Sequence, residues 1–90
     1  MSNSPEFINA ANIIVNLLSK PSTDELGDLY GLYKMATVGN NTTEKPSFIN
    51  YTANQKWQIW SSFNGLTKRQ AEIKYITLVN TLIQKYGLKK

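Results

Sequence analysis

The chain is 90 residues long, carries a net charge of +4, and contains neither cysteine nor histidine. This length fits one domain with a modest hydrophobic core. The missing residue types exclude disulfides, thiolate metal sites, histidine-based catalytic triads and the commonest zinc ligand. The positive charge favours an anionic partner such as a phosphate, a nucleic acid or a membrane surface, without distinguishing among them.

A first helix is predicted to begin at Ser4, which is a suitable N-cap and is followed by Pro5 and the acidic Glu6. The apolar residues that follow lie at steps of four, three and four, which is one stripe of a helix: Phe7, Ala11, Ile14 and Leu18. The helix is predicted to end at Lys20, because Pro21 disfavours helical geometry in the residue before it.

A second helix is predicted from Ser22, which forms a capping box with Glu25, each side chain accepting a hydrogen bond from the other's backbone N–H. Apolar and aromatic residues then recur at helical spacing: Leu26, Leu29, Tyr30 and Tyr33. Gly39 is a suitable terminator, because glycine readily adopts the left-handed conformation that ends many helices. The segment from Gly39 to Tyr51 is rich in Asn, Thr, Pro and Ser, and predicts a long crossing loop.

A third helix is predicted to begin at a second capping box, Thr52 with Gln55. Its apolar residues are Trp57, Trp60 and Phe63, and it is expected to end at Asn64-Gly65.

A third capping box, Thr67 with Gln70, opens the longest amphipathic run of the chain. Its apolar face is spaced as one helical stripe: Ala71, Tyr75, Leu78 or Val79, Leu82 and Tyr86. Gly87 is expected to end this helix. The pattern predicts an all-α protein of four helices, and the short links between helices favour consecutive helices that lie side by side and antiparallel.

Residues 29–39 form a pattern of higher specificity. They read Tyr30, two residues, then Tyr33-Lys34-x-Ala-Thr-x-Gly39, and so resemble the signature of the acyl-CoA-binding protein family. Lys56-Trp57 with Trp60 matches the family's Lys-Trp-x-x-Trp, and Lys85-Tyr86-Gly87 matches its usual ending. The resemblance extends from Phe7 to Gly87. It implies a four-helix bundle of the acyl-CoA-binding protein type (up-down-down-up), with the long loop between helices two and three and residues 1–90 as one acyl-CoA-binding domain.

The resemblance implies an intracellular carrier and pool former for medium- to long-chain fatty acyl-CoA esters in lipid metabolism. Four side chains would gather around the 3′-phosphate of coenzyme A: Tyr30, Lys34, Lys56 and Tyr75. Tyr33 would lie against the adenine, and Phe7 and Ala11 would line the acyl path. The chemistry is reasonable, because Tyr30 and Lys34 share a helix face and charge-assisted hydrogen bonds bind phosphate strongly.

Two positions depart from the family pattern. Val15 stands where many members have a lysine, which predicts that one phosphate contact is lost or comes from elsewhere. Gly27 stands where a bulkier apolar residue is usual near the acyl groove. A glycine there opens space for a longer or differently placed acyl chain, unless a shifted helix or a neighbouring side chain fills the gap.

No nucleophile–base pair is predicted, so we expect a binding protein that is not an enzyme and needs no cofactor or metal. We expect a monomer in the cytoplasm that binds no nucleic acid, has no stable membrane insertion, and has acyl-CoA-using enzymes as candidate partners; no secretory signal is visible at the N-terminus. The alternative is a basic helical module that binds nucleic acid, a membrane or a protein surface. It lacks a basic recognition helix, and the apolar stripes look narrow enough to be used up in helix packing.

Overall fold

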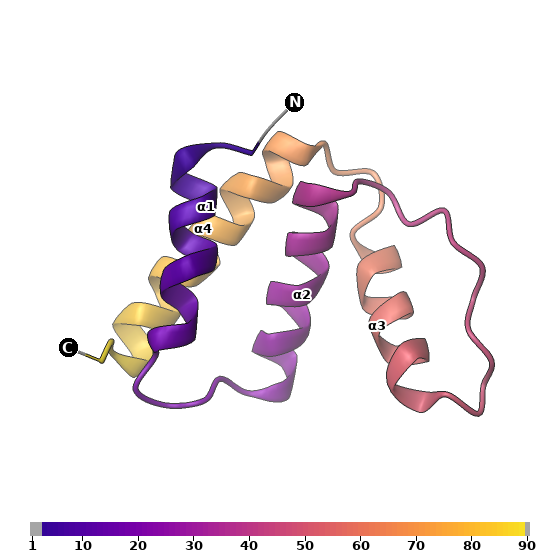
Figure 1. Cartoon of the computed structure of the whole chain (residues 1–90), viewed down its shortest axis with the longest axis horizontal. Helices are drawn as coiled ribbons and strands as arrows, with labels where there is room; N and C mark the ends of the chain where they lie inside the picture. The colour runs from indigo at the N-terminus through magenta and orange to yellow at the C-terminus, as the bar shows by residue number, and fades with distance from the viewer. Residues whose placement is uncertain (1–2, 90) are drawn as a thin grey trace.

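Four α-helices and one 3-10 turn make up residues 3–89, the part of the chain that the computed structural model describes. The helices are α1 (Pro5–Ile13), α2 (Thr23–Thr37), α3 (Tyr51–Ser62) and α4 (Lys68–Tyr86), and the turn is η1 (Ile14–Asn16). α1 and α4 run in one direction and α2 and α3 in the other (Figure 1). The predicted all-α, up-down-down-up bundle with a long second connection is therefore confirmed. The ends of the proposed 1–90 domain lie outside the described residues.

Three of the four predicted helix starts are confirmed by their hydrogen bonds. Ser4 Oγ accepts from the Phe7 N–H at 3.2 Å, and both capping boxes, Ser22 with Glu25 and Thr67 with Gln70, are complete. The predicted start at Thr52 is wrong. Asn50 caps α3 instead, with its side-chain oxygen 3.2 Å from the Ala53 N–H, because asparagine at the end of the preceding turn offers an equally good acceptor.

The first helix ends earlier than its apolar stripe predicts. α1 stops at Ile13, and the chain is extended at Leu17, which is buried, whereas Leu18 is 60% exposed. The cause lies at the other end of the chain. The Leu18 N–H donates to the Gly87 carbonyl at 2.9 Å, and Leu17 pairs with Leu88 in a short antiparallel bridge. This distant pairing replaces the predicted final helical turn.

Helix packing centres on α4, which lies behind α1 and packs against both α1 and α2, while α3 packs on α2 (Figure 1). The two pairs of helices joined by short links, α1 with α2 and α3 with α4, are therefore not the main packing pairs. The prediction that helices joined by short links lie side by side is wrong for both. The longest helix instead crosses two others and buries its apolar stripe between them. The least exposed residues come from α2 and α4: Met35, Ala36, Ala71, Val79 and Leu82.

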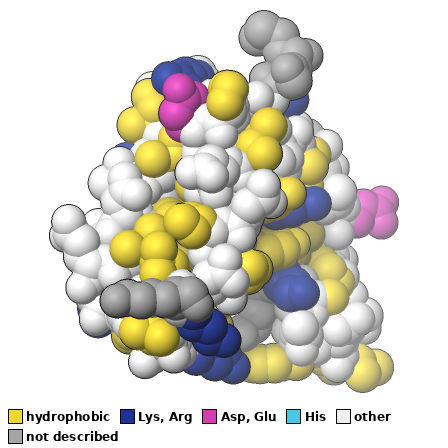
Figure 2. Space-filling view, turned by 60° about the vertical axis from the view of Figure 1, so that its left-hand side comes forward, with side chains coloured by type: hydrophobic (Ala, Val, Ile, Leu, Met, Phe, Trp, Pro, Cys, Tyr) yellow, Lys and Arg dark blue, Asp and Glu magenta, His cyan; other side chains and the backbone are white. Residues whose placement is uncertain are grey.

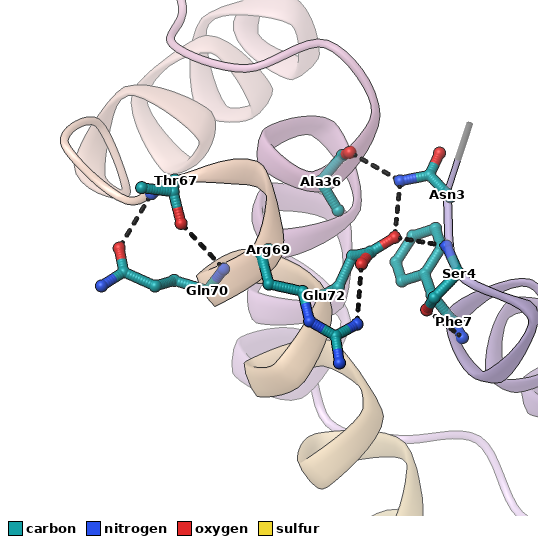
Figure 3. Close-up of polar contacts among 8 residues, drawn as sticks. All are labelled: Asn3, Ser4, Phe7, Ala36, Thr67, Arg69, Gln70 and Glu72. Atoms are coloured by element: carbon teal, nitrogen blue, oxygen red, sulfur yellow. Dashed lines mark hydrogen bonds and ion pairs between the residues drawn. The ribbon is translucent and has the colours of Figure 1, made fainter. Parts of the chain in front are cut away.

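A buried acid joins the start of α1 to α2 and α4. The Glu72 carboxylate accepts from the Ser4 N–H at 2.8 Å, the Asn3 amide at 2.9 Å and the Arg69 guanidinium at 3.1 Å (Figure 3). The Asn3 amide also donates to the Ala36 carbonyl at 2.8 Å. Burial raises the pKa of Glu72, but these hydrogen bonds lower it by more, so the carboxyl stays ionised.

Two glycines of α2 bring α3 close. A Cβ atom at Gly31 would lie 2.5 Å from the Phe63 ring, and one at Gly27 would lie 3.1 Å from Ile59 Cδ1. Ile59 therefore occupies the space that Gly27 leaves. Of the alternatives for Gly27, the structure shows the one in which a neighbouring side chain fills the gap. This close approach positions Lys56 of α3 beside α2.

Hydrogen bonds from the long loop between α2 and α3 also fix α3. The buried Asn41 side chain donates to Ser61 Oγ at 2.9 Å, and the Trp60 indole N–H donates to the Gly39 carbonyl at 2.7 Å. Gly39 has a φ of 101°, as its predicted role in ending α2 requires. Among residues 3–89, no helix is both long enough and apolar enough to span a membrane.

Candidate ligand-binding site

An open groove of about 600 Å³ runs along one face of α2, between the end of α1 and α4. Its lining is mostly apolar, with one lysine and three tyrosines: Ile14, Val15, Pro21, Leu26, Leu29, Tyr30, Tyr33, Lys34, Thr37 and Tyr75. α2 supplies most of these residues, because steps of three and four place side chains on one helical face. The face drawn in Figure 2 shows Lys and Arg side chains set among hydrophobic ones.

Three aromatic rings pack together at this groove. The centroid of the Phe7 ring lies 4.9 Å from that of Tyr75 and 5.7 Å from that of Tyr33, and the two tyrosine rings are 6.1 Å apart. Phe7 is buried and does not line the groove, so it supports the two tyrosines from α1. Ser4 and Glu72 hold the start of α1, and this contact keeps Phe7 in register with Tyr75.

The hydroxyl of Tyr75 is suited to act as a neutral donor. Burial raises its pKa, and the neighbouring Tyr33 adds to the shift. The Tyr75 hydroxyl has no hydrogen-bond partner among residues 3–89, and the ring lines the groove. A protonated hydroxyl at the edge of an apolar groove can donate a hydrogen bond to a ligand anion.

Two lysines approach the groove over aromatic rings. Lys34 Nζ lies 4.7 Å from the Trp60 ring centroid, and Lys56 Nζ lies 5.5 Å from that of Tyr30. Neither ammonium group forms an ion pair with a carboxylate of the described chain, in contrast to Arg69 and Lys85. Lysines without acidic partners, held over aromatic faces, are available to an external anion.

Tyr30 joins the two lysines into one site. It lines the main groove together with Lys34, and it lines a smaller adjacent hollow of about 220 Å³ together with Lys56 and Tyr51. Lys34 of α2 therefore shares a groove with Tyr30, and Lys56 of α3 lies over the Tyr30 ring. The arrangement suits a ligand with a phosphorylated head group and an apolar tail.

The predicted site residues fall into three groups. Tyr30, Tyr33, Lys34 and Tyr75 line one groove. Lys56 lies beside them across the Tyr30 ring. Phe7 lies beneath the tyrosines, and Ala11 is partly buried and packed against the core, so neither belongs to the groove lining.

Several groove residues were not singled out as ligand-binding residues in the sequence. Leu26, Leu29 and Thr37 belong to the same α2 face as Tyr30 and Lys34, so their spacing was a usable signal. Ile14 of η1 and Pro21 of the link before α2 also line the groove, and local sequence does not indicate how this segment folds back onto α2. Val15 also lines the groove and is 76% exposed, so the position that often carries a lysine in the family is an apolar wall here.

Within residues 3–89, no group of three or more histidine, cysteine, aspartate or glutamate side chains could hold a metal ion. The groove contains the hydroxyls of three tyrosines and Thr37, one ammonium group and hydrocarbon, which together can hold an amphipathic anion.

Comparisons with known proteins agree with this geometry. The family model described as acyl CoA binding protein matches residues 4–79. The acyl-CoA-binding protein of Saccharomyces cerevisiae is 48% identical over 81 residues, covering 90% of this chain and 93% of the yeast protein. Acyl-CoA-binding protein homolog 1 of Caenorhabditis elegans is 44% identical over 81 residues, covering 90% of this chain and 94% of its own length.

Solved structures resemble the fold as well. The crystal structure of Oryza sativa acyl-CoA-binding protein 2 has a TM-score of 0.86 and 38% identity, covering 89% of each chain. The solution structure of the yeast acyl coenzyme A binding protein has a TM-score of 0.73 and 46% identity, covering 93% of this chain and 98% of the yeast chain.

Proposed function

This chain belongs to the acyl-CoA-binding protein family, and from that premise we propose how it binds a fatty acyl-CoA ester. The protein acts as a non-covalent carrier of such esters. In our proposal the coenzyme A head group lies between α2, α3 and α4, and the acyl chain follows the apolar part of the groove.

The observation that supports this proposal best is the pair of lysines without acidic partners around Tyr30. Lys34 and Lys56 approach from two helices, and Tyr75 adds a neutral hydroxyl from a third. A 3′-phosphate requires several cations and donors that converge, because each charge-assisted hydrogen bond contributes about 1.5–3 kcal/mol. We therefore assign Tyr30, Lys34, Lys56 and Tyr75 to the 3′-phosphate, and the exposed Tyr33 ring to the adenine.

The apolar walls account for the acyl half of the ligand. Ile14, Val15, Leu26 and Leu29 provide hydrocarbon along the groove, and each buried methylene of an acyl chain contributes about 0.8 kcal/mol. The affinity should therefore rise with chain length over medium and long chains. Phe7 and Ala11 remain predicted residues of the acyl path, with Phe7 acting through the tyrosines that it supports.

We propose that the protein leaves the thioester intact and needs no cofactor. We further propose that it works as a monomer in the cytoplasm, with residues 1–90 as one domain, and that it delivers its ligand to acyl-CoA-using enzymes. The alternative of a nucleic-acid-binding module has no support from a particular contact in the described chain.

Calorimetric titration tests the assignment. Palmitoyl-CoA, kept below its micelle concentration, should bind tightly at one-to-one stoichiometry, free CoA much more weakly and palmitate negligibly. Lys34→Ala should weaken palmitoyl-CoA and CoA alike by roughly 10- to 100-fold, the equivalent of one lost charged hydrogen bond.

Lys74→Ala is the matched control, since it removes an exposed lysine of α4 that does not line the groove. It should bind like the parent chain, and both variants should keep the parent's melting temperature. If Lys34→Ala binds palmitoyl-CoA as tightly as the parent chain does, the phosphate assignment is wrong.

A further inference from the structure

One wall of the ligand groove lies outside the α-helices. Ile14, Val15 and Pro21 line the groove from the segment between α1 and α2, and every other lining residue belongs to α2 or α4. These three residues and the chain between them are here called the link wall. Connecting segments are more mobile than the helices they join, so the position of the link wall depends on what holds it.

Two backbone hydrogen bonds join the link wall to the residues that follow α4. The Leu18 N–H donates to the Gly87 carbonyl at 2.9 Å, and the Lys89 N–H donates to the Asn16 carbonyl at 2.8 Å. Residues 87–89, here called the strap, therefore lie beside the lower end of α1 (Figure 1). The strap holds the link wall from behind, because none of its residues lines the groove.

Apolar packing anchors the middle of the strap. Leu17 and Leu88 are paired in an antiparallel bridge, with one of the two hydrogen bonds on each side of the pair. Leu17 is 8% exposed, and Leu88 is partly buried and packed against the same core. Loss of the Leu88 side chain would therefore remove the apolar contact that supports both hydrogen bonds.

The backbone at Gly87 lets the strap come this close. Gly87 has a φ of 79° and a ψ of 163°, a conformation essentially restricted to glycine. A Cβ atom at this position would lie 2.9 Å from Leu18 Cδ1. Any side chain at position 87 would therefore strain the turn and push against the link wall.

The last turn of α4 is also tied to the start of α2. Glu25 accepts hydrogen bonds from Lys85 Nζ at 2.9 Å and from the Tyr86 hydroxyl. Leu26, the next residue along α2, lines the groove. The end of α4 and the strap therefore fix the link wall relative to the start of α2, and so fix the width of the groove between them.

We propose that the strap positions the acyl chain, with Gly87 and Leu88 as positioning residues that act through the link wall. The inference rests on the proposed function, in which the acyl chain follows the apolar part of the groove. A link wall held in place buries the methylenes of the chain, and a loose one leaves them in water. The head group should be affected little, since Lys34 lies nine residues further along α2 than Glu25, roughly 13 Å at 1.5 Å per residue.

Calorimetric titration with ligands of increasing length tests the inference. The series is CoA, octanoyl-CoA, dodecanoyl-CoA and palmitoyl-CoA, each below its micelle concentration. In the parent chain each fully buried methylene should raise the affinity about fourfold. Leu88→Ser should flatten this rise, so that palmitoyl-CoA binds about tenfold more weakly while the affinity for CoA changes by less than about twofold.

Two further variants separate positioning from general destabilisation. Leu66→Ser is the matched control, because Leu66 is also partly buried against the core, precedes α4 as Leu88 follows it, and does not line the groove. It should keep the parent's rise of affinity with chain length. Leu88→Met keeps an apolar side chain of similar volume and should restore that rise.

Hydrogen exchange of the Leu18 amide, measured without ligand, reports whether the strap is closed. Exchange should accelerate in Leu88→Ser and in Gly87→Ala, which disturbs the turn without removing an apolar side chain, and should not accelerate in Leu66→Ser. Unchanged exchange in both strap variants would overturn the proposed role of the strap. Accelerated exchange with an unchanged rise of affinity, or equal weakening of CoA and palmitoyl-CoA, would overturn its effect on the acyl chain.

Failure of this inference is distinguishable from failure of the proposed function. A parent chain that bound none of the esters would refute the proposed function and this inference with it. A parent chain whose affinity rises with chain length, beside a Leu88→Ser variant with the same rise, would refute only the inference.

Discussion

The three-helix unit of α1, α2 and α4 and the single helix α3 are held in different ways. In the described chain, the buried hydrophobic residues belong to the three-helix unit or the link after α1, except for Trp60 of α3. The unit therefore has an ordinary close-packed core. α3 has little core of its own and packs mainly on α2.

The attachment of α3 depends on close approach and on directional bonds. Gly31 lets the Phe63 ring lie against the α2 backbone, and Gly27 does the same for Ile59. Asn41 and the Trp60 indole then fix α3 to the loop. Stability and site geometry are therefore set in different places, because Lys56 belongs to α3 while the other head-group residues belong to the three-helix unit.

The largest effect is expected from a cavity in the three-helix unit. Met35 has no exposed surface, so Met35→Ala should lower the free energy of unfolding by about 2–5 kcal/mol. Urea denaturation measures this loss. Hydrogen exchange should accelerate in all four helices together, because α3 depends on the unit for support.

Ile73→Ala is the control, since Ile73 lies on α4 and is 50% exposed. It should change the stability by no more than about 0.5 kcal/mol. If exchange in Met35→Ala accelerated only in α2 and α4, α3 would be stable without the core. That result would contradict the dependence of α3 on the three-helix unit.

A smaller effect, confined to α3, is expected from filling the glycine contact. Gly31→Leu places a side chain where the Phe63 ring lies, which should cost about 1–3 kcal/mol in overpacking. The displaced α3 would carry Lys56 away from Tyr30. Hydrogen exchange should therefore accelerate mainly in residues 51–62, and palmitoyl-CoA affinity should fall at temperatures where the chain is fully folded.

Gly27→Ala provides the comparison variant. Its Cβ would be tight only against the terminal methyl of Ile59, at 3.1 Å, which can move. Alanine also gains about 1 kcal/mol of helix propensity over glycine. We expect nearly unchanged stability and binding. Equal effects of the two variants would mean that α3 tolerates displacement and that its glycine contacts do not set the site.

The sequence indicated those features that depend on nearby residues. Two capping boxes and the N-cap Ser4 located three helix starts, and the spacing of Tyr30, Tyr33 and Lys34 placed them on one face of α2. The cap of α3 was missed because Asn50 and Thr52 are both good caps, and only the turn that Asn54 holds decides between them.

Features that depend on distant residues could not be predicted. The pairing of Leu17 with Leu88 ends the α1 segment early, and it joins the link after η1 to the residues that follow α4. The sequence analysis did not single out Glu72, because its burial depends on Asn3 and Ser4, nearly seventy residues away. In the site, the placement of Lys56 on the Tyr30 ring follows from the way α3 docks on α2.

The smallest effect is expected from acid titration of a contact within the three-helix unit. Glu25 of α2 accepts hydrogen bonds from the Tyr86 hydroxyl, the Ser22 N–H and Lys85. These bonds, that from Tyr86 first, lower the pKa of Glu25 from 4.5 to about 2. A carboxyl whose pKa is lower in the folded state stabilises fully above its unfolded pKa, and this contribution is lost as the pH falls through the folded value.

Glu25→Gln should therefore lower the melting temperature at neutral pH by a modest, constant amount down to about pH 4.5, and the difference from the parent chain should shrink toward pH 2. Lys85 stays charged throughout, because this pH range lies far below its pKa, which the hydrogen bond to Glu25 raises further from 10.5. Glu44→Gln, at an exposed loop acid without a hydrogen bond to the described chain, should show no such trend. Since α3 contains no acid, its hydrogen-exchange rates should change less with pH than those of α2 and α4. If the difference in melting temperature between Glu25→Gln and the parent chain did not depend on pH, the charge of Glu25 would not be what holds α2 to α4.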